Sequence, residues 1–433
     1  DAHVDVCIIG AGYSGLWTAY YLKKLDPSLD ILVVEKEFAG FGASGRNGGW
    51  LTGGFAWSHR KYLAGGSADS LRRMVRQMAG SVDEVIAVAE SEGIDADIVR
   101  TDELLFATNR AQWQRAKEEL DERLHWGETP DRLYLIDAGA AKARINIPGT
   151  LGALVVGGVA RIQPAKLVRG LADAVERMGV RIVEGTAVTG ISPGRVKTAR
   201  GEVRAANILR TTEGFTASLP GLRREWLPLN SAQIITEPVP PDVWDEIGWQ
   251  GHEIAGDFKN SYCYCQRTRE GRIAVGARGT PYKFGSAIDD NGTPDPGTVA
   301  QLVSVLHRHF PAARGLRIDH AWCGVLGVPR DWCATVGFDA KSGTGWAGGY
   351  VGVGVSTSNL AGRTLADLVL GRQTELVDLP WVNRQVRKWE FEPLRWLGVH
   401  TMYQLYKMAD DNEAKGLDSP SRLAGLANWL TGR

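Results

Sequence analysis

Glycines near the beginning of the chain have the spacing of a dinucleotide-binding turn. Gly10, Gly12 and Gly15 form the pattern GxGxxG. The first glycine allows a tight turn, the second lets the backbone approach a pyrophosphate, and the third lets a helix pack closely on a strand. Glu35 follows 20 residues after Gly15, where an acid accepts hydrogen bonds from a ribose. A turn without any ligand is the alternative, but it leaves this charge unexplained at the end of a buried strand.

The segments around this motif predict a βαβ unit. Residues 4–9 and 31–34 are short apolar runs rich in β-branched side chains, which is typical of buried parallel strands. Between them, Leu16, Ala19 and Leu22 have helical spacing. Because this helix would begin at the glycines, its free N–H groups and the positive end of its dipole would face the phosphates. The sequence therefore predicts an α/β fold with a Rossmann-type domain.

A second glycine cluster narrows the dinucleotide to FAD. Residues 40–49 contain five glycines, one arginine and one asparagine. A flat ring system that lies against backbone requires such a loop, since only glycine permits that approach, whereas a nicotinamide cofactor does not require it. Arg46 and Asn47 are our candidates for positions beside the flavin ring. Anchoring of the loop is the alternative role for both residues.

The run from Val4 to Trp50 resembles the flavin-binding N-terminus of the D-amino-acid oxidase, glycine oxidase and sarcosine oxidase superfamily, including its γ-glutamylputrescine oxidase-like branch. The resemblance implies a Rossmann-type FAD domain and a discontinuous second α+β domain built on an antiparallel sheet. Residues 67–92 and 111–125 have the apolar spacing of amphipathic helices. The expected ranges are 1–57, 150–220 and 321–378 for the FAD domain, 58–149 and 221–320 for the substrate domain, and 379–433 for a C-terminal helical extension.

Later segments match further parts of the superfamily's flavin site. A helix and a strand ending at Val188 match an element whose backbone touches the adenine, although an ordinary strand residue would look the same. Thr212 and Gly214 resemble a turn against the diphosphate, from which Glu213 departs. Residues 345–355 open another helix at a glycine-rich turn, whose N–H groups would face the flavin pyrimidine oxygens. The residues expected to bind FAD are Gly10, Gly12, Tyr13, Ser14, Gly15, Glu35, Lys36, Gly42, Ala43, Ser44, Arg46, Asn47, Gly48, Gly49, Val188, Thr212, Gly214, Cys323, Gly324, Gly349, Gly352, Val353, Gly354 and Val355.

The resemblance implies oxidation of the C–N bond of an amine or amino acid by hydride transfer to flavin N5, giving an imine that hydrolyses. Tyr264 and Gln266 lie on one face of an alternating strand and are candidate substrate contacts, with cross-strand packing as the alternative. Either Arg267 or Arg278 could pair with a substrate carboxylate, or could be a solvated strand-end charge. The residues expected at the reacting centre are Arg46, Asn47, Trp50, Tyr264, Gln266 and Tyr350.

Three alternatives stay open at this point. Sarcosine-oxidase-like enzymes link flavin covalently through a cysteine at a place comparable to Cys323, but many relatives bind FAD non-covalently, and a buried cysteine usually packs. Those enzymes also carry a lysine that activates oxygen, on a strand corresponding to residues 272–276, which has none; Lys259 lies outside the match. O2 as electron acceptor is therefore in doubt, and a dehydrogenase is an alternative. The remaining rivals are a flavin enzyme that acts on another bond of a small metabolite and a flavin-binding protein without turnover.

Composition limits the partners. Among 433 residues, 50 basic and 50 acidic side chains give a formal net charge of zero, which argues against nucleic acid or a membrane surface bound through charge. No apolar run has the length of a membrane span, and no signal peptide is recognisable. The odd number of cysteines, five, predicts a reduced, cytoplasmic protein. Cys263 and Cys265 resemble half a metal site, but His307 and His309 diverge on their helix, so no metal is expected.

Overall fold

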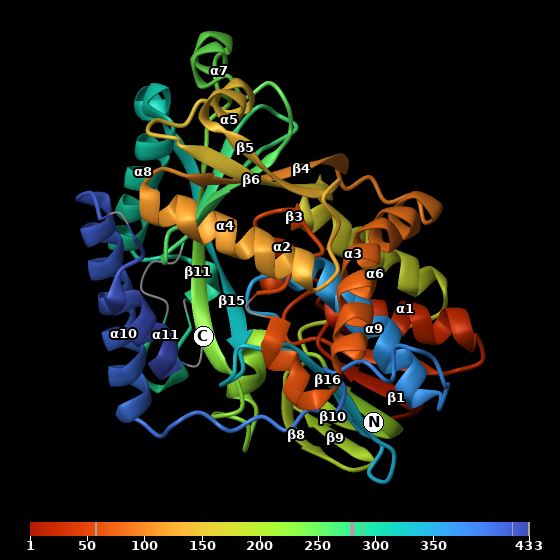
Figure 1. Cartoon of the computed structure of the whole chain (residues 1–433). Coiled ribbons are helices and arrows are strands. Elements are labelled where there is room, and N and C mark those ends of the chain that lie inside the picture. The colour runs from red at the N-terminus through yellow and green to blue at the C-terminus, as the bar shows by residue number, and fades with distance from the viewer. Residues whose placement is uncertain (57–58, 278–281, 289, 418, 432–433) are drawn as a thin grey trace.

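The computed structural model describes residues 1–56, 59–277, 282–288, 290–417 and 419–431. Two sheets organise the chain, and the C-terminal helices α10 (Leu394–Ala414) and α11 (Arg422–Thr431) lie along one side, in blue at the left of Figure 1. Two long strands, β11 (Leu227–Thr236) and β15 (Ile318–Val328), run from the upper sheet down to the region of the lower one. These strands connect the two halves of the molecule.

The first sheet contains the parallel strands that the sequence predicts, together with antiparallel pairs at its edges. Because β7 runs parallel to β2, the return of the chain to this sheet after residue 180 is confirmed. A hairpin of β8 (Val188–Ser192) and β9 (Arg195–Thr198) joins the sheet through β10. The strands in spatial order are β16 (Thr335–Asp339), β17 (Thr344–Gly348), β10 (Gly201–Arg210), β1 (Ala2–Ile9), β2 (Ile31–Val34) and β7 (Arg181–Val183).

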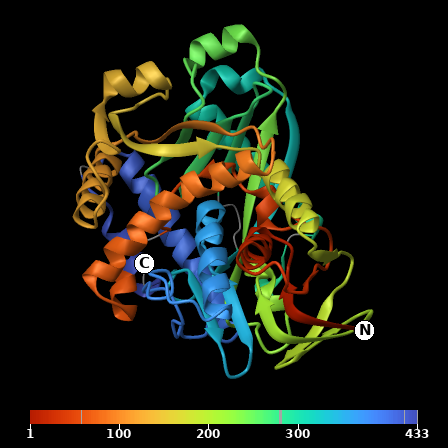
Figure 2. The same cartoon turned by 90° about the vertical axis from the view of Figure 1, so that its right-hand side faces the viewer.

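Helices cover one face of this sheet, and the β8–β9 hairpin contributes to the packing on the other. Figure 2 shows α9 (Gly354–Val369) beside α1 (Tyr13–Leu25) on the helical face. Their contact requires glycine, because a Cβ at Gly362 would lie 2.6 Å from the Cβ of Trp17. Trp17 is fully buried in the core that α3 (Ala68–Ser91) and α6 (Pro164–Arg177) also enter. Val196 of the hairpin packs with β1 residues on the opposite face.

The second sheet is antiparallel apart from one parallel pair, β12 with β4. Helix α8 (Pro296–His309) packs against it through Leu302 and Leu306. The strands in spatial order are β15, β11, β14 (Ile273–Ala277), β13 (Cys263–Arg267), β12 (Ile254–Asp257), β4 (Val99–Ala107), β6 (Gly152–Arg161) and β3 (Trp50–Leu51), and β5 (Leu133–Asp137) pairs with β6.

Sheet membership differs from the expected domain ranges at three strands. Strands β3, β6 and most of β15 fall within the ranges expected for the FAD domain, but they belong to the second sheet. The physical reason is that an apolar strand fits the middle of either sheet, and its periodicity does not name its partner. The long β6 is buried along most of its length and pairs with β3, β4 and β5.

The remaining helices are α2 (Ala43–Arg46), α4 (Arg110–His125), α5 (Ala138–Arg144) and α7 (Pro241–Ile247), with 3-10 turns η1 (His59–Gly65), η2 (Glu213–Ser218), η3 (Phe284–Ser286), η4 (Asp290–Gly292) and η5 (Pro311–Gly315).

None of the helices in the described ranges combines the length and apolar character that crossing a bilayer requires.

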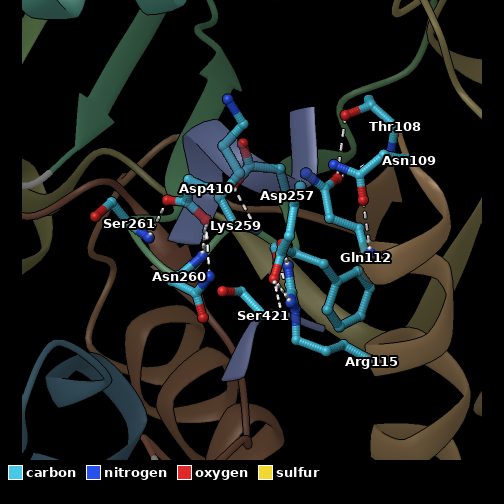
Figure 3. Close-up of polar contacts among 12 residues, drawn as sticks. Thr108, Asn109, Gln112, Arg115, Asp257, Lys259, Asn260, Ser261, Asp410 and Ser421 are labelled. Carbon is cyan, nitrogen blue, oxygen red and sulfur yellow. Dashed lines mark hydrogen bonds and ion pairs between the residues drawn. The ribbon is translucent and has the colours of Figure 1, made fainter. Parts of the chain in front are cut away.

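The C-terminal extension is attached to the second domain by buried charge. Glu413 has a fully buried side chain, and its carboxylate accepts two hydrogen bonds, of 2.7 and 2.9 Å, from the Arg115 guanidinium. The Arg115 Nε donates to the carbonyl of Phe258 at 2.9 Å. Asp410 accepts hydrogen bonds from the backbone of Asn260 and Ser261, as Figure 3 shows. The extension therefore holds the loop between β12 and β13.

The ion pair between Arg115 and Glu413 gives a first prediction. Glu413→Gln leaves a largely buried guanidinium without its counter-charge, so the docked extension should lose about 3 kcal/mol of local stability. Native-state hydrogen exchange of the α10 amides measures this opening free energy. Arg387→Gln is the control, because the pair between Arg387 and Glu390 is exposed and should contribute little. Equal effects of the two substitutions would contradict the role given to Glu413.

Candidate functional site

One cavity brings together segments that are far apart in the chain, between residues 9 and 358. The start of α1, the end of β2, the loop around α2, the start of β8, the η2 turn, β15 and the start of α9 all contribute to it. Its polar and charged lining comes from Ser14, Glu35, Lys36, Glu37, Ser44, Asn47, Thr186, Thr211, Thr212, Glu213, Ser218 and Ser358, together with the hydroxyls of Tyr13 and Tyr350.

The predicted glycine turn forms the floor of this cavity. Gly10 has a φ of +104°, and a Cβ at Gly15 would lie 2.0 Å from the carbonyl oxygen of Gly10. A Cβ at Gly12 would lie 2.9 Å from the hydroxyl of Ser44. The N-cap residue of α1, Gly12, has no side chain, and the Ser44 hydroxyl accepts the N–H of Tyr13 at 2.8 Å, so the N–H groups that follow in the first turn remain available for an anion. The structure thus has the backbone cradle that a diphosphate requires.

Glu35 marks the end of the cavity that suits an adenosine. Its carboxylate accepts the N–H groups of Ala11 at 2.8 Å and Glu37 at 2.9 Å. Each oxygen retains capacity for another hydrogen bond, as a ribose would require. Burial raises the pKa of Glu35. Lys36 and Val188 line the same end, and these positions fit the sequence prediction.

Tyr350 lies with the cofactor residues rather than with the expected substrate residues. Its hydroxyl is 2.6 Å from the Ser14 hydroxyl, at the start of α1. Helix α9 begins directly afterwards, and Gly352, Gly354 and Val355 line the cavity there. As at α1, the N-cap residue of α9 provides no side-chain cap. The prediction of Tyr350 as a substrate contact is therefore not supported by its position.

Glu213 is a site residue whose role sequence reasoning missed. It takes a positive φ of 42° and lines the cavity. Its carboxylate accepts the N–H of Tyr350 at 2.8 Å and also that of Gly327. Burial raises the pKa of Glu213 to about 7. The side chain thus ties the η2 turn to β15 and to the turn before α9; its departure from the superfamily pattern was the available signal.

Arg46 anchors the second glycine cluster and does not line the cavity as described. Its guanidinium lies 4.3 Å from the ring centre of Phe41 and donates to the carbonyl of Cys323 at 3.3 Å. Its own carbonyl accepts hydrogen bonds from Gln233 at 2.6 Å and from Trp322 at 3.0 Å. The anchoring alternative is therefore what the geometry shows, and sequence reasoning did not identify Gln233 and Trp322.

Asn47 combines both of the roles considered for it. Its side-chain amide donates to the carbonyls of Ala43 and Ser44, and its Oδ1 accepts the N–H of Gly49. Asn47 also lines the cavity, next to Ala43 and Ser44. The same side chain therefore shapes the loop and faces the cofactor space.

The second sheet contacts the loop of residues 40–49, which we call the flavin loop, and three of the predicted residues lie at this contact. Gln266 Nε2 donates to the carbonyl of Gly48 at 2.7 Å. The hydroxyl of Tyr264 is 3.0 Å from that of Ser231, and a Cβ at Gly48 would lie 2.6 Å from the Tyr264 ring. Trp50 donates from its indole to the carbonyl of Cys265 at 3.2 Å. None of Trp50, Tyr264 and Gln266 lines the described cavity; together they hold the flavin loop.

Several other predicted residues shape the cradle from behind or lie apart from it. A Cβ at Gly214 would lie 2.7 Å from Val325, and one at Gly349 would lie 2.4 Å from Pro329. These glycines allow Val325, which lines the cavity, and Pro329, which does not, to approach closely, because a side chain would fill the contact. The predicted cofactor residues outside the described lining are Gly15, Arg46, Gly48, Gly49, Gly214, Cys323, Gly324, Gly349 and Val353.

The side chains considered for binding a substrate carboxylate, for covalent flavin attachment and for oxygen activation do not appear in the described lining of the cavity. Arg267 donates to the carbonyl of Trp249 and stacks on Trp244, and Arg278 lies outside the described residues. Cys323 is buried, with its thiol donating to the carbonyl of Gly324 at 3.3 Å. Lys259 lies in the loop held by the C-terminal extension, as Figure 3 shows. Within the described lining, Lys36 is the only lysine, and it lies at the adenosine end.

Comparisons with known proteins agree with this geometry. Residues 5–368 match the family described as FAD dependent oxidoreductase (DAO). A γ-glutamylputrescine oxidoreductase of Escherichia coli is 29% identical over 373 residues, which cover 85% of this chain and 84% of that protein. A glycine oxidase of Bacillus licheniformis is 23% identical, over 88% of this chain and 95% of that protein.

Solved structures show the same fold. The glycine oxidase from Geobacillus kaustophilus superposes with a TM-score of 0.73 at 22% identity, over 86% of this chain and 96% of that one. The L-proline dehydrogenase from P. horikoshii gives a TM-score of 0.72 at 20% identity, over 88% of this chain and 97% of that one.

The packing at Gly15 gives a second prediction. Gly15→Ala should remove bound FAD, because the new methyl group would lie 2.0 Å from a backbone oxygen that cannot move freely. The flavin released on acid precipitation, per mole of purified protein, measures this loss. Gly80→Ala is the matched control, since Gly80 is also inside a helix but a Cβ there meets nothing within 4 Å. Full flavin content in Gly15→Ala would refute the cradle.

Glu213 gives a third prediction, on pH. Its carboxyl is neutral below about pH 7 and ionised above it, and an anion there opposes the diphosphate. As the pH rises from about 6 to about 8, the dissociation constant of FAD should therefore increase. The increase should reach up to about tenfold for each unit by which bound cofactor raises the pKa of Glu213. Titration of apoprotein with FAD, followed by fluorescence, measures the dissociation constant at each pH.

Two variants isolate the contribution of Glu213. Glu213→Gln should flatten the pH dependence of FAD binding, because its amide does not ionise. Glu37→Gln should leave the dependence as in the wild type, since Glu37 lines the other end of the cavity and is partly exposed. An unchanged slope in Glu213→Gln would show that another group is responsible.

Proposed function

The chain belongs to the FAD dependent oxidoreductase (DAO) family, and from this premise we propose that it oxidises the C–N bond of a small amine or amino acid. The observation that carries the proposal is the cavity that joins the three predicted glycine segments, with Glu35 at one end and the starts of helices α1 and α9 along it. The names of the relatives support the substrate class, since they include a γ-glutamylputrescine oxidoreductase and a glycine oxidase.

When bound, FAD supplies a two-electron acceptor at N5. The bond between hydrogen and the carbon next to the amine nitrogen breaks, and the hydrogen leaves with both electrons. The resulting imine takes up water and divides into a carbonyl compound and an amine. The protein orients the substrate and excludes water during this step.

The residues around the cavity are suited to positioning. Among the described residues that line it, none is a histidine or an aspartate, and the carboxylates of Glu35 and Glu213 accept backbone N–H groups. A substrate amine that enters neutral needs no base to release the electrons. The loop around α2 is held by Gln233, Trp322 and Gln266, so the backbone beside the flavin ring is rigid before substrate arrives.

We propose that FAD is bound non-covalently. The thiol of Cys323 is directed to the carbonyl of Gly324, and Cys323 is absent from the described lining of the cavity.

The identity of the electron acceptor is a further part of the proposal. Because the described lining near the reacting end contains no lysine, we propose slow reaction with O2 and a different physiological acceptor.

The domain division and the compartment are also proposals. We propose the ranges 1–57, 150–220 and 321–378 for the FAD domain and 58–149 and 221–320 for the substrate domain, with β3, β6 and β15 shared through the second sheet. The extension over 379–433 then braces the substrate domain. All five cysteines are buried and none forms a disulfide within the described residues, which supports a reducing, cytoplasmic location.

The fourth prediction tests the reaction directly. The purified flavoprotein is mixed without oxygen with γ-glutamylputrescine, putrescine, glycine, sarcosine and L-proline in turn. At least one of them should bleach the oxidised flavin absorption, because substrate electrons reduce the ring. Dithionite is the control for reducible flavin, and simple alcohols and hydroxy acids are the control for oxidation of another bond.

The outcomes separate the alternatives. Bleaching by an alcohol alone would replace the proposed bond, and bleaching by dithionite alone would indicate a flavin-binding protein without this turnover. Enzyme reduced by its amine is then mixed with air-saturated buffer. Rapid return of the oxidised spectrum would overturn the proposed slow reaction with O2.

A further inference from the structure

A group of reactive side chains lies on the second sheet, on the face that is turned away from the flavin loop. It consists of Asp257 at the end of β12, Cys263 at the start of β13 and His309 at the end of α8, all buried. Tyr264, the next residue along β13, packs against Gly48 of the flavin loop. Because neighbouring strand residues point to opposite faces, the Cys263 side chain is directed away from the flavin loop.

The spacing of the three side chains fits a single metal ion. His309 Nε2 is 3.5 Å from Cys263 Sγ and 3.4 Å from Asp257 Oδ2, and one ligand atom from each residue lies within 4.8 Å of the others. For tetrahedral zinc, bond lengths of about 2.3 Å to sulfur and about 2.0 Å to nitrogen and oxygen place S and N about 3.5 Å apart and N and O about 3.3 Å apart. The observed separations agree with both values.

The hydrogen bonding of His309 presents a lone pair to the group. Its Nδ1 lies 3.0 Å from the carbonyl of Val305, which only accepts, so Nδ1 carries the proton and donates it. In the neutral ring, Nε2 then carries a lone pair, and this nitrogen lies 3.5 Å from the thiol sulfur and 3.4 Å from the carboxylate. A histidine that binds a metal usually has this arrangement, with its other ring N–H on a backbone carbonyl.

The carboxylate completes the set. Asp257 Oδ1 accepts the backbone N–H of Cys263 at 3.1 Å, whereas the buried Oδ2 makes no hydrogen bond among the described residues and has His309 Nε2 3.4 Å away. A buried carboxylate oxygen without a hydrogen bond is costly, and a cation between it and the ring nitrogen would satisfy it.

From this geometry we propose that Asp257, Cys263 and His309 bind a divalent ion of the zinc type. The mixed sulfur, nitrogen and oxygen set suits Zn²⁺ rather than Mg²⁺ or Ca²⁺, which prefer oxygen. Because all three ligands are buried, we assign the ion a structural role. The ion ties the C-terminal end of α8 to the strand whose other face holds the flavin loop.

The same observation explains why the sequence predicted no metal. His307 and His309 diverge on α8, as expected, but only His309 is needed. Asp257 comes from the preceding strand, and His309 is 46 residues from Cys263. No local motif joins residues at these distances, so only the packing of α8 on the sheet shows the group.

The fifth prediction tests the site with zinc and cobalt. Untagged holoenzyme, expressed with added zinc, should contain one zinc per chain by mass spectrometry of the metal. After a chelator removes it, Co²⁺ should bind with one-to-one stoichiometry and give thiolate-to-cobalt charge-transfer absorption. The midpoint of thermal unfolding should fall on chelation and return with Zn²⁺.

Variants locate the ion. Cys263→Ser and His309→Gln should each lose bound zinc and the cobalt spectrum, while His307→Gln, on the same helix but outside the group, should retain both. Flavin content is measured in parallel, so that loss of the fold is distinguished from loss of the metal. If wild-type holoenzyme contains no zinc and its cobalt titration shows no charge-transfer band, the proposal is wrong whatever the variants do.

Discussion

The structure depends on a close approach of backbones at the start of α1. There, a Cβ at Gly15 would lie 2.0 Å from the carbonyl oxygen of Gly10 and 2.8 Å from the hydroxyl of Thr211. Thr211 donates to the carbonyls of Ile9 and Gly10, so β10 is fastened to β1 at the same point. This packing sets the helix start over the carboxyl edge of the parallel sheet, where open α/β sheets bind their ligands. Glu213 extends the arrangement by joining η2 to the turn before α9.

The second sheet acts on this site mainly through the loop of the second glycine cluster. Gln233, Gln266 and Trp322 donate hydrogen bonds to backbone carbonyls of that loop. Strand β13 is itself held from behind by α8 and at its beginning by the C-terminal extension, through Asp410. The flavin loop is therefore held by strands that come much later in the chain, and one of these strands is in turn held by the C-terminal extension.

Local patterns predicted local structure well. The apolar spacing over 67–92 and 111–125 corresponds to α3 and α4, and the βαβ unit with its glycine turn is formed as expected. Side-chain roles depended on partners distant in the chain. Arg46 was expected beside the flavin ring, but its guanidinium turns to Phe41 and Cys323. Tyr350 was expected near substrate, but its hydroxyl meets Ser14, which is 336 residues away.

The sequence by itself determined the cofactor, because the fingerprint from Gly10 to Glu35 acts through backbone geometry that only glycine and a correctly spaced acid supply. It also determined the family, through the loop from Gly42 to Gly49. Only the tertiary structure decided which of the predicted residues face the cavity, that Glu213 bridges two turns, and that Asp257, Cys263 and His309 meet. The physical reason is that a side chain's direction and partners are set by packing between elements, whereas a glycine turn carries its own conformational requirement.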